Sequence, residues 1–156
     1  METLVITGDN YNGNFNISRT ACRSIVIKDG KILMSYETNR DQWMIPGGGI
    51  EPGESAIECV IRETKEETGY IIKPSECLLE IREYYEDWEY INRYYTGEII
   101  GQTERKLTEA EIRNGLEPRW VNISEMNEIL SSYKQYALTN EMRCGMYYRE
   151  YSALNN

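Results

Sequence analysis

Three glutamates are spaced so that one helix would gather them on one face. Glu63, Glu66 and Glu67 lie in the segment RETKEETGY. At ~100° per residue, Glu66 and Glu67 fall at about −60° and +40° from Glu63. The three carboxylates would repel each other, and they lie toward the end of the helix where the macrodipole disfavours anions. A hard divalent cation would compensate them, and Mg²⁺ or Mn²⁺ would also bridge to substrate phosphates and activate water.

The helix that carries these acids is predicted over residues 55–68. Ser55 and Glu58 form a Ser-x-x-Glu capping box, and Gly69 is placed to end the helix. Arg62 flanks Glu66 at i+4, where it can pair with an acid. We expect a buried stripe on the neighbouring face. It consists of Ile57, Val60, Ile61, Thr64 and Thr68. The alternative to a metal site is an acidic face that only solvates an amphipathic helix.

The segment before the helix, residues 43–54, is rich in Gly and Pro and is predicted to be a loop. Gly48 and Gly53 have the spacing of a phosphate-binding P-loop. Glu54, however, stands where that motif has its lysine, and a carboxylate there repels phosphate. The segment therefore does not bind a nucleotide as a P-loop does.

The other elements are predicted from local patterns. A turn at Asn12-Gly13 indicates a short hairpin between residues 4–8 and 15–18, within an N-terminal extension of residues 1–18. Asp29-Gly30 indicates a second hairpin in residues 22–37. The remaining predictions are two or three antiparallel strands in 70–101, a loop with a helical turn in 105–117, a strand in 118–123, a helix from Ser124 to about 132 and a helical tail in 136–153. We expect residues 19–156 to form a single domain.

Composition excludes several classes of function. The 156 residues carry a net charge of −9, which argues against nucleic acid or an anionic membrane as the main partner. There is no histidine, so catalytic triads with a His base and His-ligated metals are excluded. The four cysteines form no Cys-x-x-Cys pair. The start of the chain has no signal-peptide pattern and no apolar run is long enough for a membrane span, so we expect a cytoplasmic protein.

Residues 48–70 resemble the Nudix box. The family pattern is Gly, five residues, Glu, seven residues, Arg-Glu, an aliphatic, any residue, Glu-Glu, any residue, Gly and an aliphatic. All seven fixed positions match, namely Gly48, Glu54, Arg62, Glu63, Glu66, Glu67 and Gly69. The two aliphatic positions differ, because Thr64 and Tyr70 occupy them. The flanking patterns extend the resemblance over roughly residues 20–132.

The resemblance implies an α/β/α sandwich around a mixed sheet. It also implies hydrolysis of a phosphoanhydride bond in a nucleoside diphosphate linked to another group, with Mg²⁺ or Mn²⁺. By position, Glu66 and Glu67 would bind the ions, with Glu63 as a further ligand or water activator and the Gly47 carbonyl as a further ligand. Arg62 would orient the glutamates. Gly48, Glu54 and Gly69 would have structural roles, Glu54 at the loop–helix junction.

Outside the box, three residues are candidates for contacting a substrate. Among the loop acids Glu109, Glu111 and Glu117, we prefer Glu117. Tyr85 represents an aromatic group that could stack on a base. That group consists of Tyr84, Tyr85, Trp88, Tyr90, Tyr94 and Tyr95. Arg23 is the third candidate.

The alternatives for function are a nucleotide-binding regulatory module without turnover and a purely structural acidic helix. The substrate would be a small nucleotide, with a dinucleoside polyphosphate as the second choice. A homodimer through the N-terminal segment and the Tyr-rich tail is also open.

Overall fold

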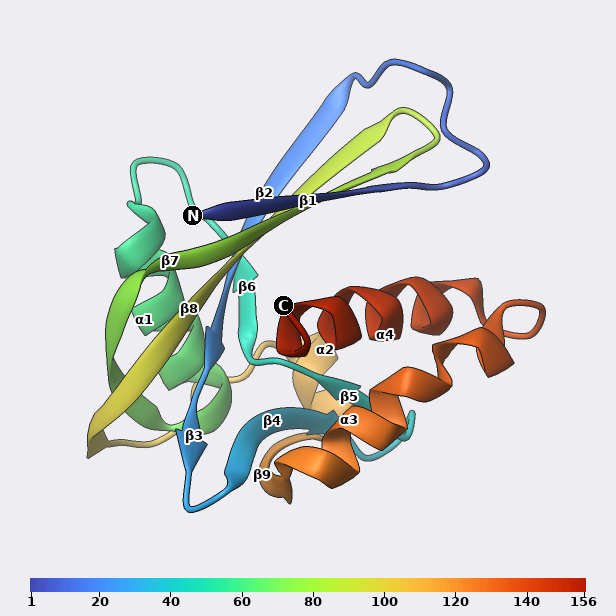
Figure 1. The fold of residues 1–156 in the computed structure, drawn as a ribbon. Coiled ribbons are helices and arrows are strands. Elements are labelled where there is room, and N and C mark those ends of the chain that lie inside the picture. The colour runs from blue at the N-terminus through green and yellow to red at the C-terminus, as the bar shows by residue number, and fades with distance from the viewer.

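The computed structural model describes all 156 residues and contains two β-sheets and four α-helices (Figure 1). The five-stranded sheet has the order β1-β7-β8-β2-β6. In this sheet β1 pairs with β7 and β2 with β8 in parallel, whereas β7–β8 and β2–β6 are antiparallel, so the sheet is mixed. Its strands are β1 (Glu2–Thr7), β7 (Tyr70–Tyr85), β8 (Trp88–Gln102), β2 (Ile17–Ile25) and β6 (Gly47–Gly49).

The smaller sheet joins β3, β4 and β5, and β9 pairs with the free side of β4. Asp29 and Gly30, both with positive φ, make the predicted turn between β3 and β4. The strands are β3 (Ile27–Lys28), β4 (Lys31–Glu37), β5 (Gln42–Met44) and β9 (Leu116–Asn122). The helical elements are α1 (Ala56–Thr68), α2 (Glu109–Arg113), α3 (Ile123–Ser131), η1 (Ser132–Tyr136) and α4 (Glu141–Leu154).

Helices cover the five-stranded sheet on both faces, which confirms the predicted α/β/α sandwich (Figure 1). On one face, Cys59 and Val60 of α1 pack against Cys22, Ile72 and Tyr95. On the other face, α3 and α4 share a core with both sheets. None of the helices combines the length and apolar sequence that a membrane crossing requires.

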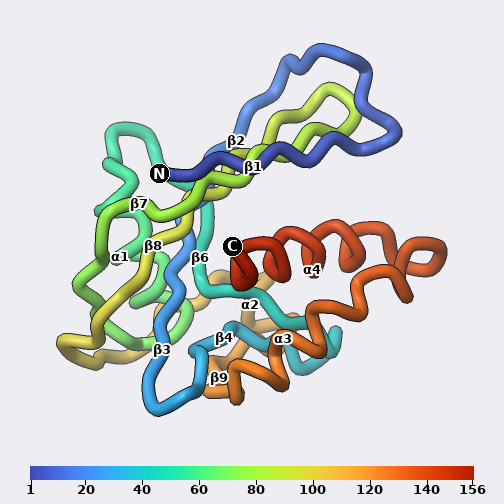
Figure 2. The backbone as a smooth tube through the Cα atoms, in the orientation of Figure 1, coloured from blue at the N-terminus to red at the C-terminus, as the bar shows by residue number.

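The predicted hairpin within residues 1–18 is wrong. Residues 2–7 instead form the edge strand of the larger sheet, with Glu2 opposite Leu79 and Thr7 opposite Tyr84. Leu4 and Ile6 then pack against the core, a gain that an isolated two-stranded hairpin could not provide. Figure 2 shows the following loop beside the β7–β8 turn, where Asn12 N donates to the Glu86 carbonyl. The division of the chain between residues 18 and 19 stays a prediction.

Two further predictions need correction. Residues 43–54 are not all loop, because they contain β6 and all but the first residue of β5. Gly47–Gly49 pairs with β2, and a Cβ at Gly47 would lie 2.3 Å from the Cys22 carbonyl, so only glycine fits this approach. The helix after β9 begins at Ile123 and is capped by Asn122, whose side chain accepts from Ser124 N, instead of by Ser124.

Candidate active site

Helix α1 holds the box acids where the sequence predicts them. Ser55 caps its start by accepting from Glu58 N at 3.1 Å, and Gly69 ends it in the left-handed conformation. Val60, Thr64 and Thr68 are buried as expected, although Ile57 lies exposed at the first turn. Thr64 occupies a position where the family pattern has an aliphatic residue. Its buried hydroxyl is not left unpaired, because Oγ1 lies 2.7 Å from Ser24 Oγ. The aromatic ring at Tyr70 packs edge-on against Trp120.

Arg62 contacts three acids of the box through one guanidinium group. Its Nε and Nη2 contact Glu54 at 2.6 and 3.0 Å, and Nη2 also donates to the Gly49 carbonyl. Nη1 donates to Glu63 at 2.9 Å and to Glu66 at 3.2 Å. The Arg62 hydrogen bond lowers the pKa of Glu54 to about 2. Arg62 therefore compensates part of the crowded negative charge and leaves less of it for a metal ion to neutralise.

Glu67 is the acid that Arg62 does not reach. Its side chain is buried, and its Oε2 accepts from Gly47 N at 2.9 Å and from Ser35 Oγ at 3.4 Å. It has no ion pair, so burial raises its pKa well above the ordinary value, partly opposed by the Gly47 N–H. A buried carboxylate without a cationic partner is costly unless something compensates it.

Glu63 lies directly over the glycine strand. A Cβ at Gly48 would be 2.5 Å from its carboxyl carbon, so this position needs glycine to let the acid approach the backbone. Burial raises the pKa of Glu63, while the hydrogen bond from Arg62 opposes that rise. Glu66 is the most exposed of the three, with 27% of its side chain accessible.

The backbone of Gly47 faces the acids. Ser24 N donates to the Pro46 carbonyl and Ile50 N to the Thr20 carbonyl, both at 2.9 Å. Because bonded and non-bonded pairs alternate along an antiparallel ladder, Gly47 opposite Arg23 belongs to a non-bonded pair. Its N–H points to Glu67, and its carbonyl opens on the same side, away from β2.

These donors suit a divalent cation in type, although they are not gathered into a cage. No group of three or more acidic or Cys side chains is close enough to hold an ion. Yet every potential ligand is an oxygen, which Mg²⁺ and Mn²⁺ prefer, and the buried carboxylate of Glu67 forms no ion pair with any Arg or Lys side chain. The residues therefore fit a hard divalent ion by chemistry and charge.

The three residues predicted to contact a substrate lie in different parts of the structure. Glu117 forms an ion pair with Arg119, the residue two places further along β9. Of the three loop acids, it is Glu111 whose charge contributes to the raised pKa of both Glu63 and Glu67. Glu111 caps α2 together with Thr108.

Arg23 lies beside Gly47 and braces the strands that precede the box. Its Nη1 donates to the Ile45 carbonyl at 2.8 Å and its Nε to Asn92 Oδ1 at 2.8 Å. Asn92 in turn donates to Glu83 at 3.3 Å, a buried acid that also contacts Arg149. Arg23 thus connects the glycine strand to a buried polar network.

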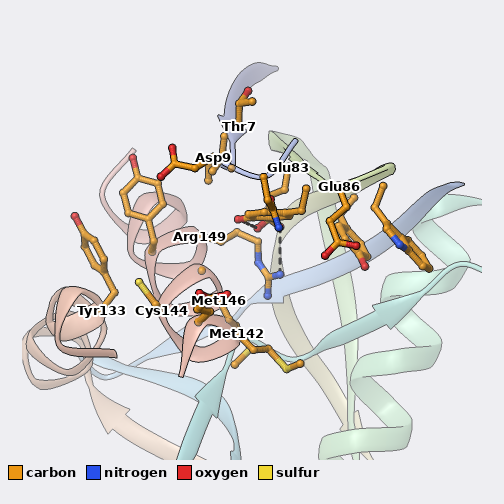
Figure 3. A pocket seen from close by; sticks show the side chains of 18 of the residues that line it. Thr7, Asp9, Glu83, Glu86, Tyr133, Met142, Cys144, Met146 and Arg149 are labelled. Atoms are coloured by element: carbon orange, nitrogen blue, oxygen red, sulfur yellow. Dashed lines mark hydrogen bonds and ion pairs between the residues drawn. The ribbon is translucent and has the colours of Figure 1, made fainter. Parts of the chain in front are cut away.

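Tyr85 lines a cavity of about 860 Å³ at the far end of the same sheet, and Figure 3 shows this cavity from close by. The β1–β2 loop, the ends of β7 and β8, η1 and α4 surround it. Trp88 and Tyr90, which belong to the predicted aromatic group, line it as well.

Arg19, which sequence reasoning missed, lies between this cavity and the box. It is opposite Tyr90 in the β2–β8 register, and it shares a sheet face with Arg23 because alternate strand residues point the same way. A Cβ at Gly49 would lie 3.0 Å from its Nη2. Arg19 is exposed and has no ion pair. The alternation of side chains along β2 indicated that Arg19 and Arg23 share one face of the sheet. It could not show that these two side chains lie against the glycines of β6.

A family model described as the NUDIX domain matches residues 18–140. The chain belongs to the NUDIX domain family. Its solved structural relatives include a NUDIX hydrolase from Nitrosomonas europaea, with a TM-score of 0.61 and 23% identity over 85% of this chain and 89% of that one. A UDP-X diphosphatase structure has a TM-score of 0.58 at 19% identity, covering 70% of this chain and 53% of the other. Both likenesses show the fold.

Curated relatives of this NUDIX chain carry different names. The m7GpppN-mRNA hydrolase of Saccharomyces cerevisiae is 29% identical over 122 residues, which are 72% of this chain and 12% of the yeast protein. The RNA pyrophosphohydrolase of Dinoroseobacter shibae is 33% identical over 54% of this chain and 57% of its own. The putative ADP-ribose pyrophosphatase YjhB of Bacillus subtilis is 41% identical over 56 residues, 36% of this chain and 27% of its own. The chain spans less than two thirds of the length of each.

Proposed function

We propose that this protein hydrolyses a phosphoanhydride bond in a nucleoside diphosphate linked to another group, with Mg²⁺ or Mn²⁺ as cofactor. The observation that carries the proposal is the buried Glu67 carboxylate beside the Gly47 backbone, next to two acids that Arg62 orients. Membership of the NUDIX domain family and relatives named as pyrophosphatases support the same reaction class.

The cation would be held by Glu63, Glu66, Glu67 and the Gly47 carbonyl. When bound, it neutralises phosphate charge and lowers the pKa of an attacking water. Arg62 keeps Glu63 and Glu66 in place through one guanidinium group, which makes it a positioning residue. The Gly47 N–H and Ser35 fix the Glu67 carboxylate. Glu117 stays our predicted additional acid, and Glu111 is a second candidate because its charge contributes to the raised pKa of Glu63 and Glu67.

The substrate would run from the box, past the edge strand β6, to the cavity on the sheet face that carries Arg19. Arg19, exposed over Gly49, would contact a phosphate between the two ends. Arg23 would keep the glycine strand in place and Tyr85 would contact the group in the cavity. The relatives named for RNA leave a nucleotide at the end of RNA as a second substrate class. A dinucleoside polyphosphate, a cytoplasmic location and a homodimer stay predictions.

The test is a hydrolysis screen with Mg²⁺ and Mn²⁺ in separate arms, over nucleotide sugars, ADP-ribose, dinucleoside polyphosphates, nucleoside triphosphates and 5′-triphosphorylated RNA. We expect cleavage that EDTA abolishes and that Glu66→Gln reduces about 100-fold or more. Glu98→Gln, an exposed acid on β8 away from the box, is the matched control. Tight binding of a nucleotide without cleavage in either arm would support the regulatory module instead. Wild-type rates in Glu66→Gln would contradict the ligand assignment.

A further inference from the structure

The cavity at the far end of the larger sheet is aromatic on its sheet side. Tyr85, Trp88 and Tyr90 line it from β7 and β8, and Tyr133 and Tyr148 line it from the helical side. The Trp88 and Tyr90 rings stack with a centroid distance of 5.3 Å and an interplanar angle of 3°. A volume of about 860 Å³ falls within the range of small-molecule sites and is large enough for a nucleoside.

The charges of the cavity are mostly negative. Asp9, Glu86 and Glu141 line it from three separate elements, and none of them forms an ion pair. The remaining charged residues in the lining, Glu83 and Arg149, contact each other at 3.4 Å. The side chain of Arg149 is 11% exposed, and its Nε is committed to Glu150. The lining therefore has three unpaired negative charges and no unpaired positive one.

The box end of this sheet face attracts anions, whereas the cavity end repels them. Arg19 is the unpaired cation between the cavity and Gly49, so phosphates are attracted to the box end. The same phosphates would be repelled by Asp9, Glu86 and Glu141 at the cavity end. The cavity must therefore take the part of the substrate that is not phosphate.

Within the function proposed above, we propose that the cavity is a subsite for a planar ring that carries a positive charge. Aromatic faces and unpaired carboxylates both attract such a ring, whereas a neutral ring gains from the aromatic faces alone. Arg149 Nη2 is buried without a hydrogen-bond partner at the same cavity, so a carbonyl oxygen on the ring would find a donor there (Figure 3). A cationic pyridine carboxamide or a methylated purine combines these properties.

Binding without cleavage tests the proposal, because it separates the subsite from catalysis. Calorimetry in EDTA would compare two matched pairs whose members differ in ring charge. The first pair is oxidised and reduced nicotinamide adenine dinucleotide, and the second is 7-methylguanosine monophosphate and guanosine monophosphate at pH 6.5. We expect the cationic member of each pair to bind about 5- to 30-fold more tightly. The preference should weaken as salt is added, because the acids at the cavity are partly exposed.

The decisive variant neutralises two exposed acids that line the cavity. Glu86→Gln combined with Glu141→Gln should reduce the preference in both pairs toward unity, with an unchanged melting temperature. Glu98→Gln, which lies outside the cavity, should leave the preference as in the wild type. Equal affinities within a pair, or tighter binding of the neutral member, would overturn the proposal even if hydrolysis is found. Conversely, a cation preference without any hydrolysis would support the subsite and contradict the proposed reaction.

Discussion

The box and the cavity handle charge in opposite ways. In the box, Glu54, Glu63 and Glu66 all contact one arginine from the same loop and helix, so their positions depend on short sequence distances. In the cavity, Asp9, Glu86 and Glu141 come from three distant parts of the chain and have no cationic partner. Local spacing therefore positions the proposed chemistry, whereas long-range packing forms the surface that would select the substrate.

The largest expected effect is in the box, at Glu67. Glu67→Gln keeps the shape of the side chain but removes the buried carboxylate, so we expect kcat to fall about 100-fold or more. Because burial raises the folded pKa of Glu67, the ionised group costs folding stability at neutral pH, and the neutral amide removes that cost. The melting temperature without metal should therefore equal or exceed that of the wild type. A clear drop in that temperature would show that the carboxylate is structural.

A substitution in the cavity should raise KM and leave kcat nearly unchanged. Trp88→Leu removes a stacking surface but leaves the box unchanged, so we expect KM to rise about tenfold, with kcat within about twofold of the wild type. Steady-state kinetics on the best substrate of the screen would measure both constants. A selective loss of kcat would mean that the two regions are not separable.

A smaller effect is expected where the box departs from its family pattern. Ser24→Ala or Thr64→Val alone leaves one buried hydroxyl unpaired and should cost about 1–2 kcal/mol in urea unfolding. The double variant replaces both partners by apolar groups, so it should cost clearly less than the sum of the two. Additive losses would mean that the 2.7 Å contact is not what accommodates Thr64.

The smallest effect concerns pH. The folded pKa of Glu54 lies at about 2, below its unfolded value, so its pairing with Arg62 stabilises the fold above the unfolded pKa of about 4.3. That contribution is lost as the pH falls toward 2. The gap in melting temperature between wild type and Glu54→Gln should therefore be widest near neutral pH and should close on acidification. A gap that stays constant down to pH 2.5 would contradict this account.

Helix α1 could be predicted from sequence because its signals are local. Ser55, Gly69 and the spacing of the acids lie within one segment and determine its ends and faces. The helical pattern paired Arg62 with Glu66, and the family resemblance made it orient the glutamates, but neither showed that Arg62 also contacts Glu54. A helical wheel places side chains around an axis, but it does not fold the Glu54 loop back onto the helix.

The remaining features depend on pairings between distant segments. Nothing in the glycines of β6 favours a strand, because their pairing comes from β2. The partner of β1 lies more than seventy residues away, while an Asn-Gly turn nearby suggested a local one. The sequence analysis preferred Glu117 to Glu111, and nothing in the local pattern showed that the charge of Glu111 acts on Glu63 and Glu67.

The position of β1 has a practical consequence. Ile6, Thr7, Gly8 and Asp9 form one wall of the cavity, although the strand lies outside the region matched by the family model. Removing the first nine residues would open this wall of the cavity, and it would also take Leu4 and Ile6 away from the core. A cleavage at this terminus would therefore alter substrate selectivity and stability together, although the contacts of Arg62 lie elsewhere in the chain.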